Sequence, residues 1–162
     1  MGEPILVLED DVRFCEHFLD AIDEICASSL PFVRLYCMDK KRERFVKRIG
    51  NTHYHWSLKN TNGTQGYYLT PRAARAFLRF GVWDSPVDVQ MEFVARHKID
   101  NIIYKPFPIA ESADAATTTI ASRFSAPASV GFCLRLLRPF YRAAVQLKRA
   151  VFKLFYRPPE MK

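Results

Sequence analysis

The clearest pattern of hydrophobic and polar positions stands near the start of the chain, where aliphatic residues 5–8 run directly into Glu9, Asp10 and Asp11. An uninterrupted apolar run of this length predicts a buried strand in a parallel sheet. Because an unpaired carboxylate is costly to bury, the acids mark the end of that strand. In open α/β sheets, ligands bind at this carboxyl end. The pattern therefore predicts a strand at 5–8 with a polar site directly after it.

Two interpretations of the three acids stay open on the residues alone. Clustered carboxylates suit a hard divalent cation, and Mg²⁺ or Mn²⁺ at such a place usually holds substrate phosphates. Alternatively, Asp10 and Asp11 are N-terminal caps of a helix from Val12 to about Ala27, because acids are favoured there. That helix would place apolar residues at spacings of three and four on one face, namely Phe14, Phe18, Ile22 and Ile25.

The following pattern alternates strands and helices as far as residue 105. Thr70 and Pro71 are a favourable cap and first residue for a helix that ends at Gly81. This helix would turn Ala73, Ala74, Phe77 and Leu78 inward and Arg72, Arg75 and Arg79 outward. Further strands are predicted at 32–38, 52–58, 65–69 and 100–105, and a further helix at 86–97 with Ser85 as its cap. The segments between them are predicted as a solvated basic segment at 40–48, a turn at 60–64 and an extended loop at 110–128.

Two histidines, His53 and His55, would lie on one face of the strand predicted at 52–58. They are close enough there to share a metal, although packing or surface roles are the more common ones for a pair of histidines. The residues alone leave open both a metal-binding role and a packing or surface role.

Residues 130–156 combine basic and apolar positions at helical spacing, with Pro139 predicted to begin the main helix. A basic amphipathic helix that contains aromatic residues is typical of a membrane-surface element. The same helix could instead pack its apolar side on the rest of the protein, so both interpretations remain.

Charge separates this tail from the rest of the chain. The net charge is +7, but residues 1–122 hold 15 Lys and Arg against 16 Asp and Glu, whereas residues 123–162 hold 9 against a single acid, Glu160. The basic character therefore belongs to the tail, and no nucleic-acid partner is expected, since the body has no nucleic-acid motif. No apolar run reaches about 18 residues, so no membrane-spanning helix is expected. Four cysteines without a CxxC pair favour reduced thiols and a cytoplasmic location.

Several motifs occur in a characteristic order. They are Leu8-Glu9-Asp10-Asp11-Val12, then Gly63-Thr64-Gln65-Gly66-Tyr67-Tyr68-Leu69 with 70–74, then Pro86-Val87-Asp88, and then Pro106-Phe107-Pro108 with Ser112. In this order and at these separations, over roughly residues 4–125, the chain resembles glycosyltransferase family 25. That family comprises bacterial lipopolysaccharide and lipo-oligosaccharide glycosyltransferases, often galactosyltransferases, together with collagen galactosyltransferases.

The resemblance implies an α/β fold of the GT-A type and transfer of a hexose, with galactose expected, from a UDP-sugar to a lipopolysaccharide or lipo-oligosaccharide acceptor. It implies inversion at the anomeric carbon and a divalent metal, Mn²⁺ or Mg²⁺. By resemblance, Asp10 and Asp11 are the metal ligands, with Asp11 as the first direct ligand and Asp10 or Glu9 assisting. Asp88 is the expected catalytic base. The expected donor- or acceptor-binding residues are Gly66, Tyr67 and Glu9.

The family also has a substantial segment before the acidic motif, so the resemblance implies a GT-A-like domain that is incomplete at its N-terminus and is completed by a missing N-terminal half or a second chain. The expected division is a catalytic domain at 1–125 and a basic amphipathic tail at 126–162, which could contact anionic membrane at the inner face of the cytoplasmic membrane. The alternatives are a non-catalytic remnant or partner module of the same fold, and a membrane-surface protein that acts through its tail.

Overall fold

The structure is a computed structural model that describes residues 2–58, 61, 63–79, 86–112 and 132–157. The chain divides into two units, one of residues 1–115 with 158–162 and one of residues 116–157. The first unit combines strands and helices, and the described part of the second is the helix α6 (Phe132–Phe155). The domain boundary predicted at 125/126 lies outside the described residues and stays a prediction.

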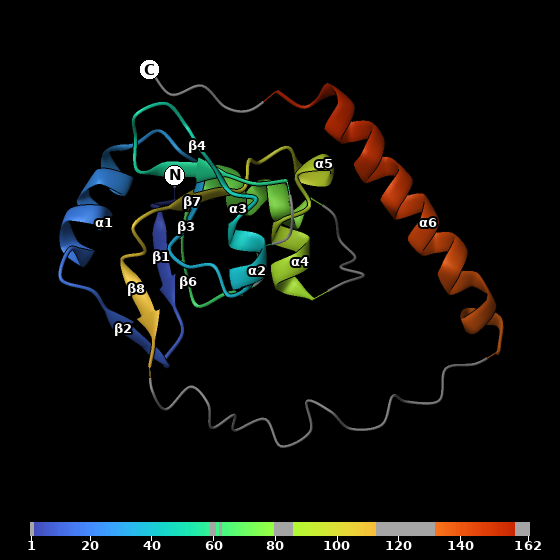
Figure 1. Ribbon diagram of the computed structural model, residues 1–162, viewed down its shortest axis with the longest axis horizontal. Helices are drawn as coiled ribbons and strands as arrows, with labels where there is room; N and C mark the ends of the chain where they lie inside the picture. Colours follow the sequence, from blue (N-terminus) through green and yellow to red (C-terminus); the bar gives the residue numbers. More distant parts are fainter. Residues whose placement is uncertain (1, 59–60, 62, 80–85, 113–131, 158–162) are drawn as a thin grey trace. The chain divides into compact units, whose positions relative to one another are not determined.

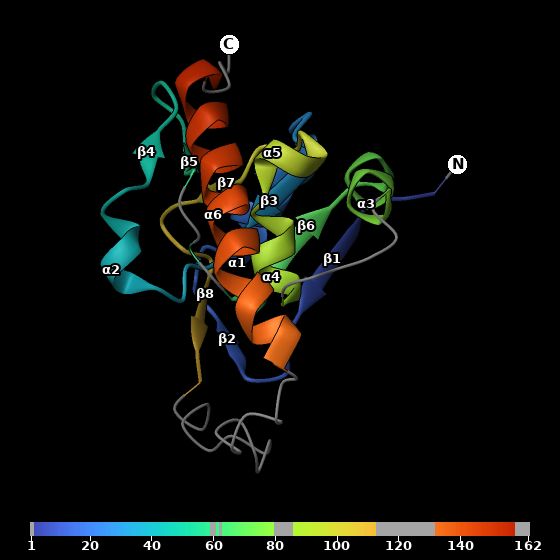
Figure 2. The ribbon, with the colours of Figure 1, turned by 90° about the vertical axis from the view of Figure 1, so that its right-hand side faces the viewer.

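The centre of the first unit is a six-stranded mixed sheet in the order β1–β6–β3–β7–β5–β4 (Figures 1 and 2). β3 and β7 run parallel, and the other neighbouring strands run antiparallel. The strands are β1 (Ile5–Leu8), β3 (Phe32–Arg34), β4 (Lys47–Arg48), β5 (Tyr54–Trp56), β6 (Gly66–Leu69) and β7 (Ile102–Tyr104). A separate two-stranded sheet pairs β2 (Val12–Phe14) with β8 (Ile109–Glu111).

Helices cover both faces of the six-stranded sheet, as Figures 1 and 2 show from two directions. On one face, α1 (Phe18–Ala27) packs Ala21 and Ile25 against strand residues. On the other, α3 (Pro71–Leu78) and α4 (Val87–Met91) form a second buried cluster with Phe32. Two short helices, α2 (Lys40–Glu43) and α5 (Val94–His97), complete the unit.

The strand β6 shows how the sequence builds these two faces. Its side chains alternate, as they must in a strand: Tyr68 belongs to the cluster under α1, whereas Tyr67 and Leu69 pack against the cluster under α3 and α4. The strand predicted at 65–69 is confirmed, and its neighbours bury both faces.

The strand predicted at 5–8 is confirmed in its bounds and wrong in its environment. Among the described strands, β1 lies at an edge of the sheet and pairs antiparallel only with β6, and Ile5 is 52% exposed. An apolar run is compatible with an edge strand as well as a central one, so hydropathy could not decide between them.

The helix predicted from Val12 is wrong over its first part. Residues Val12–Phe14 form a strand, and α1 begins only at Phe18. Asp10 and Asp11 lie in the turn between β1 and β2 and are not helix caps. The cause is a long-range pairing with Ile109–Glu111, of which residues 110 and 111 were predicted as loop. Such a pairing overrides local helical periodicity.

The predictions around α3 are largely confirmed. The Thr70 hydroxyl accepts a hydrogen bond from the Ala73 N–H at 3.4 Å, and Pro71 opens the helix. Ala73 and Phe77 are buried and the three arginines are exposed, but Leu78, predicted inward, is 71% exposed because the helix ends there. Gly81 and Ser85 lie outside the described residues.

Other predicted elements are shorter or divided. The helix predicted at 86–97 is split into α4 and α5, with Asp88 in the first turn of α4 as expected. The strands predicted at 32–38, 52–58 and 100–105 are confirmed over three residues each. The turn predicted at 60–64 falls partly outside the described residues.

α6 begins at Phe132, so Pro139 lies inside the helix. The prediction that Pro139 begins this helix is therefore wrong. Of the helices in the described ranges, none combines the length and the apolar character needed to cross a membrane.

Candidate functional site

The acidic motif occupies the turn that follows β1. The Glu9 N–H donates to the Gln65 carbonyl at 2.9 Å, and the Glu9 carboxylate accepts a hydrogen bond from the Thr64 hydroxyl. The Asp11 carbonyl accepts from the Ser112 N–H at 2.7 Å, so the pairing of β2 with β8 fixes the other end of the turn. Asp10 is exposed, whereas Glu9 and Asp11 are half-buried.

Asp88 contacts the segment that also binds Glu9, through Gly63. The Gly63 N–H donates to Asp88 Oδ2 at 3.4 Å, and Asp88 itself is half-buried in the first turn of α4. Gly63 has a φ of +93°, a conformation that L side chains rarely adopt, so glycine is needed where this loop turns back on itself.

The segment Gly63-Thr64-Gln65-Gly66 therefore links two motifs that are far apart in sequence. Its residues Thr64 and Gln65 bond Glu9, and its residue Gly63 bonds Asp88. Strand pairing gives the reason: β6 runs antiparallel to both β1 and β3, so the start of β6 lies beside the ends of both. The fold brings the acidic motif, the Gly-Tyr motif and the Pro-Val-Asp motif to one end of the sheet.

Beneath this loop lies a fully buried arginine, Arg34 at the end of β3. Its guanidinium donates to the Gly63 carbonyl, to the Asp88 carbonyl at 3.2 Å and to Asn101 Oδ1 at 3.2 Å. It also pairs with buried Glu92, with Nη2 at 3.4 Å from Oε1. Burial lowers the pKa of Arg34, and the carboxylates of Glu92 and Asp88 oppose that shift.

Glu92 extends this buried polar core to a third segment. Its Oε1 atom accepts hydrogen bonds from the Thr61 N–H at 2.9 Å and the Thr61 hydroxyl at 2.7 Å. β3, the 61–66 loop and α4 are thus held together through polar contacts around one cation. The Arg34 cluster, defined as Arg34, Thr61, Gly63, Asp88, Glu92 and Asn101, fixes the loop relative to Asp88.

Sequence reasoning did not identify Arg34 or Glu92. An arginine inside the apolar strand predicted at 32–38 was the available clue, since a buried charge must find a partner. The identity of the partner could not be obtained from spacing, because Glu92 is distant in the chain and α4 had to be placed first.

The environments of Gly66 and Tyr67 differ. A Cβ atom at Gly66 would stand 2.5 Å from Ile109 Cδ1 and 3.0 Å from Leu8 Cδ2, so packing alone accounts for glycine there. Tyr67 is half-buried and pairs with Arg34 across the sheet; burial raises the pKa of Tyr67, and Arg34 opposes the shift. Contact of either residue with a donor or an acceptor stays a prediction.

One feature of the turn after β1 suits the binding of a divalent cation. Asp11 Oδ1 is buried and has no hydrogen-bond partner among the described residues, which is costly unless a ligand supplies one. No group of three or more His, Cys, Asp or Glu side chains in the described ranges forms a ready metal site. Mg²⁺-type cations are commonly held by one or two carboxylates plus substrate phosphates, so Asp11 and Asp10 can serve.

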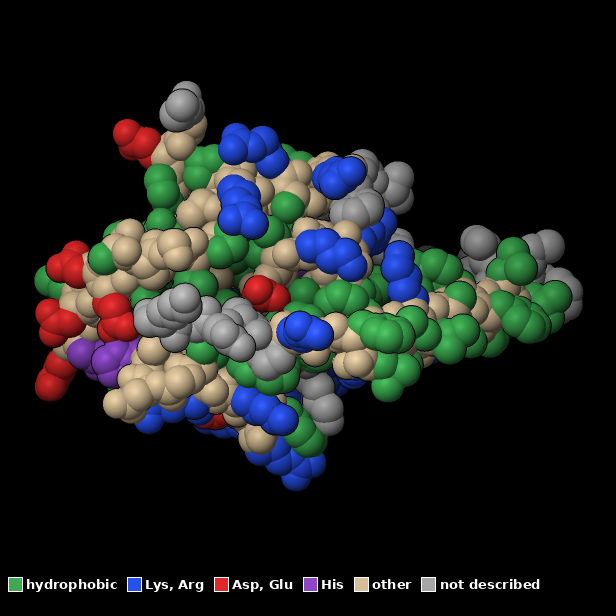
Figure 3. Space-filling model, turned by 90° about the horizontal axis from the view of Figure 1, so that it is seen from above, with side chains coloured by type: hydrophobic (Ala, Val, Ile, Leu, Met, Phe, Trp, Pro, Cys, Tyr) green, Lys and Arg blue, Asp and Glu red, His purple; other side chains and the backbone are tan. Residues whose placement is uncertain are grey.

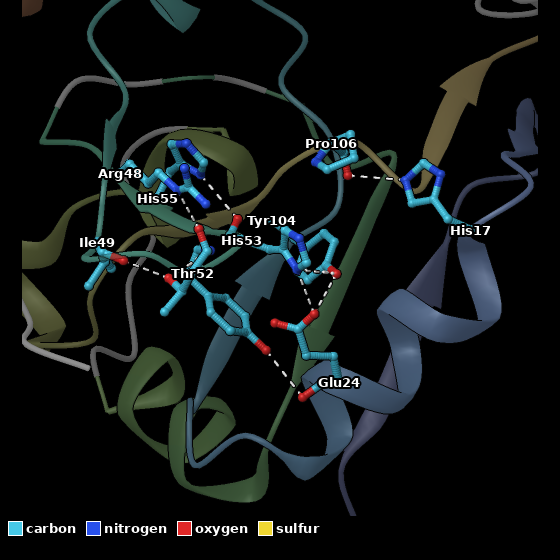
Figure 4. A network of polar contacts seen from close by, with 10 residues as sticks. His17, Glu24, Arg48, Ile49, Thr52, His53, His55, Tyr104 and Pro106 are labelled. Atoms are coloured by element: carbon cyan, nitrogen blue, oxygen red, sulfur yellow. Dashed lines mark hydrogen bonds and ion pairs between the residues drawn. The ribbon is translucent and has the colours of Figure 1, made fainter. Parts of the chain in front are cut away.

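The two histidines considered as a metal pair are engaged separately (Figure 4). His53 Nδ1 lies 2.7 Å from Glu24 Oε2, and His55 Nδ1 lies 3.0 Å from the His53 carbonyl. Tyr104 donates to the same Glu24 oxygen at 2.7 Å. Burial acts to raise the pKa of Glu24, but the hydrogen bonds from Tyr104 and His53 lower it by more. Each histidine therefore has a hydrogen-bond partner of its own, as the surface or packing interpretation requires.

Acidic side chains gather at the side of the first unit where α1 lies, next to histidine side chains (Figure 3). Glu24 belongs to α1, whereas Asp10 and Asp11 lie in the turn after β1. The contacts of Glu24 are with His53, Tyr54 and Tyr104, so they lie apart from the contacts of the acidic motif.

The first unit is thus a mixed α/β structure with three polar motifs at one end of its sheet. The sequence model of glycosyltransferase family 25, described as an LPS biosynthesis protein, matches residues 2–91. The chain belongs to glycosyltransferase family 25. The match includes the acidic motif, the 63–74 segment and Asp88, and it ends before the Pro106-Phe107-Pro108 motif.

No curated protein and no solved structure matches the chain. The family indicates a glycosyltransferase of lipopolysaccharide biosynthesis, which in general uses a sugar donor and an acceptor.

Proposed function

We propose that this protein transfers a hexose, with galactose as the expected sugar, from a UDP-sugar to a lipopolysaccharide or lipo-oligosaccharide acceptor with inversion. In this proposal the first unit is a GT-A-like domain that works at the inner face of the cytoplasmic membrane. The observation that carries the proposal is that one short segment, Gly63 to Gly66, contacts both Glu9 of the acidic motif and Asp88.

In the proposed reaction, Asp11 and Asp10 hold Mn²⁺ or Mg²⁺ against the donor diphosphate, and Glu9 orients the turn. The cation would neutralise the charge that develops on the leaving nucleoside diphosphate. Support comes from the buried Asp11 Oδ1, which lacks a partner among the described residues. Glu9 is already bonded to Thr64, so its part is to hold the 63–66 segment in place.

Asp88 is the proposed base that removes the proton from the attacking acceptor hydroxyl. General-base catalysis needs a carboxylate held within hydrogen-bond reach of that hydroxyl. The Gly63 N–H fixes one carboxylate oxygen, and Arg34 fixes the Asp88 backbone, so the group is oriented before substrate arrives. Tyr67, on the strand beside Arg34, is the residue proposed to contact a sugar ring, since an aromatic ring with a hydroxyl can stack on a sugar or hydrogen-bond it.

The test begins with calorimetric titration of UDP and UDP-galactose into the purified chain, with and without Mn²⁺. We expect metal-dependent binding that Asp11→Asn weakens at least about tenfold, since one ligand of a cation shared with the diphosphate is lost. Asp23→Asn, at an exposed position of α1, is the matched control and should bind as the parent does. Failure of a folded chain to bind UDP with metal would contradict the metal role and favour the non-catalytic alternative.

The role of Asp88 is tested separately by Asp88→Asn. Transfer should fall by at least about a hundredfold, because the amide cannot take the proton, while UDP binding is retained. Turnover equal to that of the parent would exclude Asp88 as the base. Loss of UDP binding together with transfer would instead place Asp88 in donor binding.

A further inference from the structure

The helix α6 contains no acidic residue anywhere along its length. Its basic residues are Arg135, Arg138, Arg142, Lys148, Arg149 and Lys153. An ordinary solvated helix mixes the two signs of charge, because acid–base pairs three or four residues apart stabilise it. Here such pairs are impossible, and Arg138 and Arg142 stand four residues apart with the same charge. A helix of this kind favours an anionic surface.

The apolar residues of α6 occupy a stripe of their own. At about 100° per residue, Leu136, Phe140, Leu147, Val151 and Leu154 fall within an arc of about 60° on the helix circumference. Leu137 and Phe155 widen this arc to about 100°. These are bulky side chains, and they are exposed, with Phe140 at 71% and Leu154 at 80%. We call this set the α6 stripe.

The basic residues lie on the side of α6 opposite the stripe. Arg138, Arg142 and Lys153 fall within an arc of about 60° whose centre is roughly 180–200° from the stripe. All three side chains are exposed. Lys148 falls near the border between the two faces, where a long side chain can extend its charge toward phosphate while its stem stays in apolar surroundings.

We propose that α6 binds in the plane of an anionic lipid bilayer, with the α6 stripe in the outer acyl region and the arginines and lysines among the lipid phosphates. A membrane interface is the partner that uses both faces at once. Nucleic acid would engage the basic face and leave the stripe in water. Pairing with a second copy would bury the stripe, but neither helix could supply the acidic flanking residues that specify such pairs.

This proposal does not rest on the proposed sugar transfer, because it uses only residues of α6. The probe is co-sedimentation of the full chain with vesicles of phosphatidylcholine alone or of phosphatidylcholine mixed with phosphatidylglycerol. We expect binding to the anionic vesicles to be at least about tenfold tighter and to weaken as salt is added.

Two variants of α6 test the contributions of its apolar and basic faces to vesicle binding separately. Phe140→Ser/Leu147→Ser/Leu154→Ser removes the stripe and should abolish binding, and Arg138→Gln/Arg142→Gln/Lys153→Gln should reduce binding to the level seen with neutral vesicles. The matched control is Arg72→Gln/Arg75→Gln/Arg79→Gln, which removes the same charge from exposed positions on α3 and at its C-cap and should bind as the parent does. Circular dichroism without vesicles checks that each variant keeps its helix content.

Three results would overturn the proposal. The first is equal binding to both kinds of vesicle, and the second is equal loss in the α3 control, which would make overall charge the cause. The third is that the parent protein does not bind vesicles and sediments as a dimer, whereas the variant that lacks the α6 stripe sediments as a monomer. Failure of UDP titration leaves this test unaffected, so the two proposals fail separately.

Discussion

Arg34 is the residue on which the geometry of the candidate site depends most directly. Its guanidinium is buried and contacts the 61–66 loop, α4 and Asn101 at the same time. Charged groups are buried in proteins when other groups satisfy them, and here Glu92 supplies the opposite charge. The pair therefore holds the Gly63 carbonyl and the Asp88 carbonyl at fixed positions relative to β3.

We predict that Arg34→Met lowers the free energy of unfolding by about 3–5 kcal/mol, because the variant leaves the Glu92 carboxylate buried without its cation. The measurement is urea-induced unfolding followed by circular dichroism. Arg34→Met/Glu92→Gln should regain much of the loss, since the amide oxygen can still accept from Thr61 and no buried carboxylate is left at position 92. A double variant as unstable as the single one would contradict this account.

His97 gives the protein a defined response to acid. Its Nδ1 atom accepts a hydrogen bond from the Ile99 N–H at 3.0 Å, and its ring packs edge-on against Phe77 with centroids 4.6 Å apart. Protonation of Nδ1 would place an N–H group opposite the Ile99 N–H, so this hydrogen bond would be lost. Burial lowers the pKa of His97 to about 4, with Arg96 and Lys98 acting in the same direction.

The sign of the resulting pH dependence follows from the unfolded state, in which histidine has a pKa of about 6.5. Between that value and about 4 the unfolded chain binds a proton that the folded chain rejects. We therefore predict that stability is complete above pH 6.5 and falls toward pH 4, with a slope of up to about 1.4 kcal/mol per pH unit. Urea unfolding across this range measures the slope, and His97→Asn should flatten it. Equal slopes in both proteins would assign the acid sensitivity to other groups.

At the level of elements, the close packing of β6 against β1 and β8 sets the end of the sheet where the site lies. Gly66 pairs with Leu8, and the space above it is filled by Ile109. This packing joins the six-stranded sheet to the pair β2–β8, which in turn fixes the turn that carries Asp10 and Asp11.

We predict that Gly66→Ala costs about 1–3 kcal/mol, because the added Cβ would stand 2.5 Å from Ile109 Cδ1. Ile109→Val removes that atom, so Gly66→Ala/Ile109→Val should be more stable than Gly66→Ala alone. Ile109→Val by itself should cost about 0.5–1.5 kcal/mol. Thermal unfolding of the three variants decides the matter, and a double variant less stable than Gly66→Ala would show that the clash lies elsewhere.

Elements whose cause is local were predictable from the sequence. Thr70 and Pro71 specify the start of α3 through their own chemistry, and the strand predicted at 65–69 is present as β6, although its burial on both faces came only from the structure. The order of the motifs likewise pointed to the family that the sequence model confirms.

Elements whose cause is distant were not predictable. Val12–Phe14 has helical periodicity but pairs with Ile109–Glu111, nearly a hundred residues later, and this places Asp11 in a strand-to-strand turn. For the same reason the Arg34–Glu92 pair could not be found by spacing, since its partners come together only when α4 packs on the sheet.

At the level of the whole molecule, charge and chemistry belong to different parts of the chain. Residues 1–122 are close to neutral, whereas residues 123–162 carry a balance of +8. The candidate site lies within the first unit, and the basic helix lies within the second. If both proposals hold, attachment to the membrane and transfer of the sugar are separable properties.

The last prediction uses this separation. With an acceptor embedded in anionic vesicles, the α6 stripe variant should transfer sugar at least about tenfold more slowly than the parent, because it no longer concentrates at the surface. With a water-soluble oligosaccharide acceptor the same variant should match the parent, since the Arg34 cluster and Asp88 are unchanged. Asp88→Asn should lose transfer to both acceptors. Initial rates with the two acceptors therefore distinguish a helix that serves as a membrane attachment from one that takes part in the reaction, and an equal loss with the soluble acceptor would place α6 in the catalytic machinery.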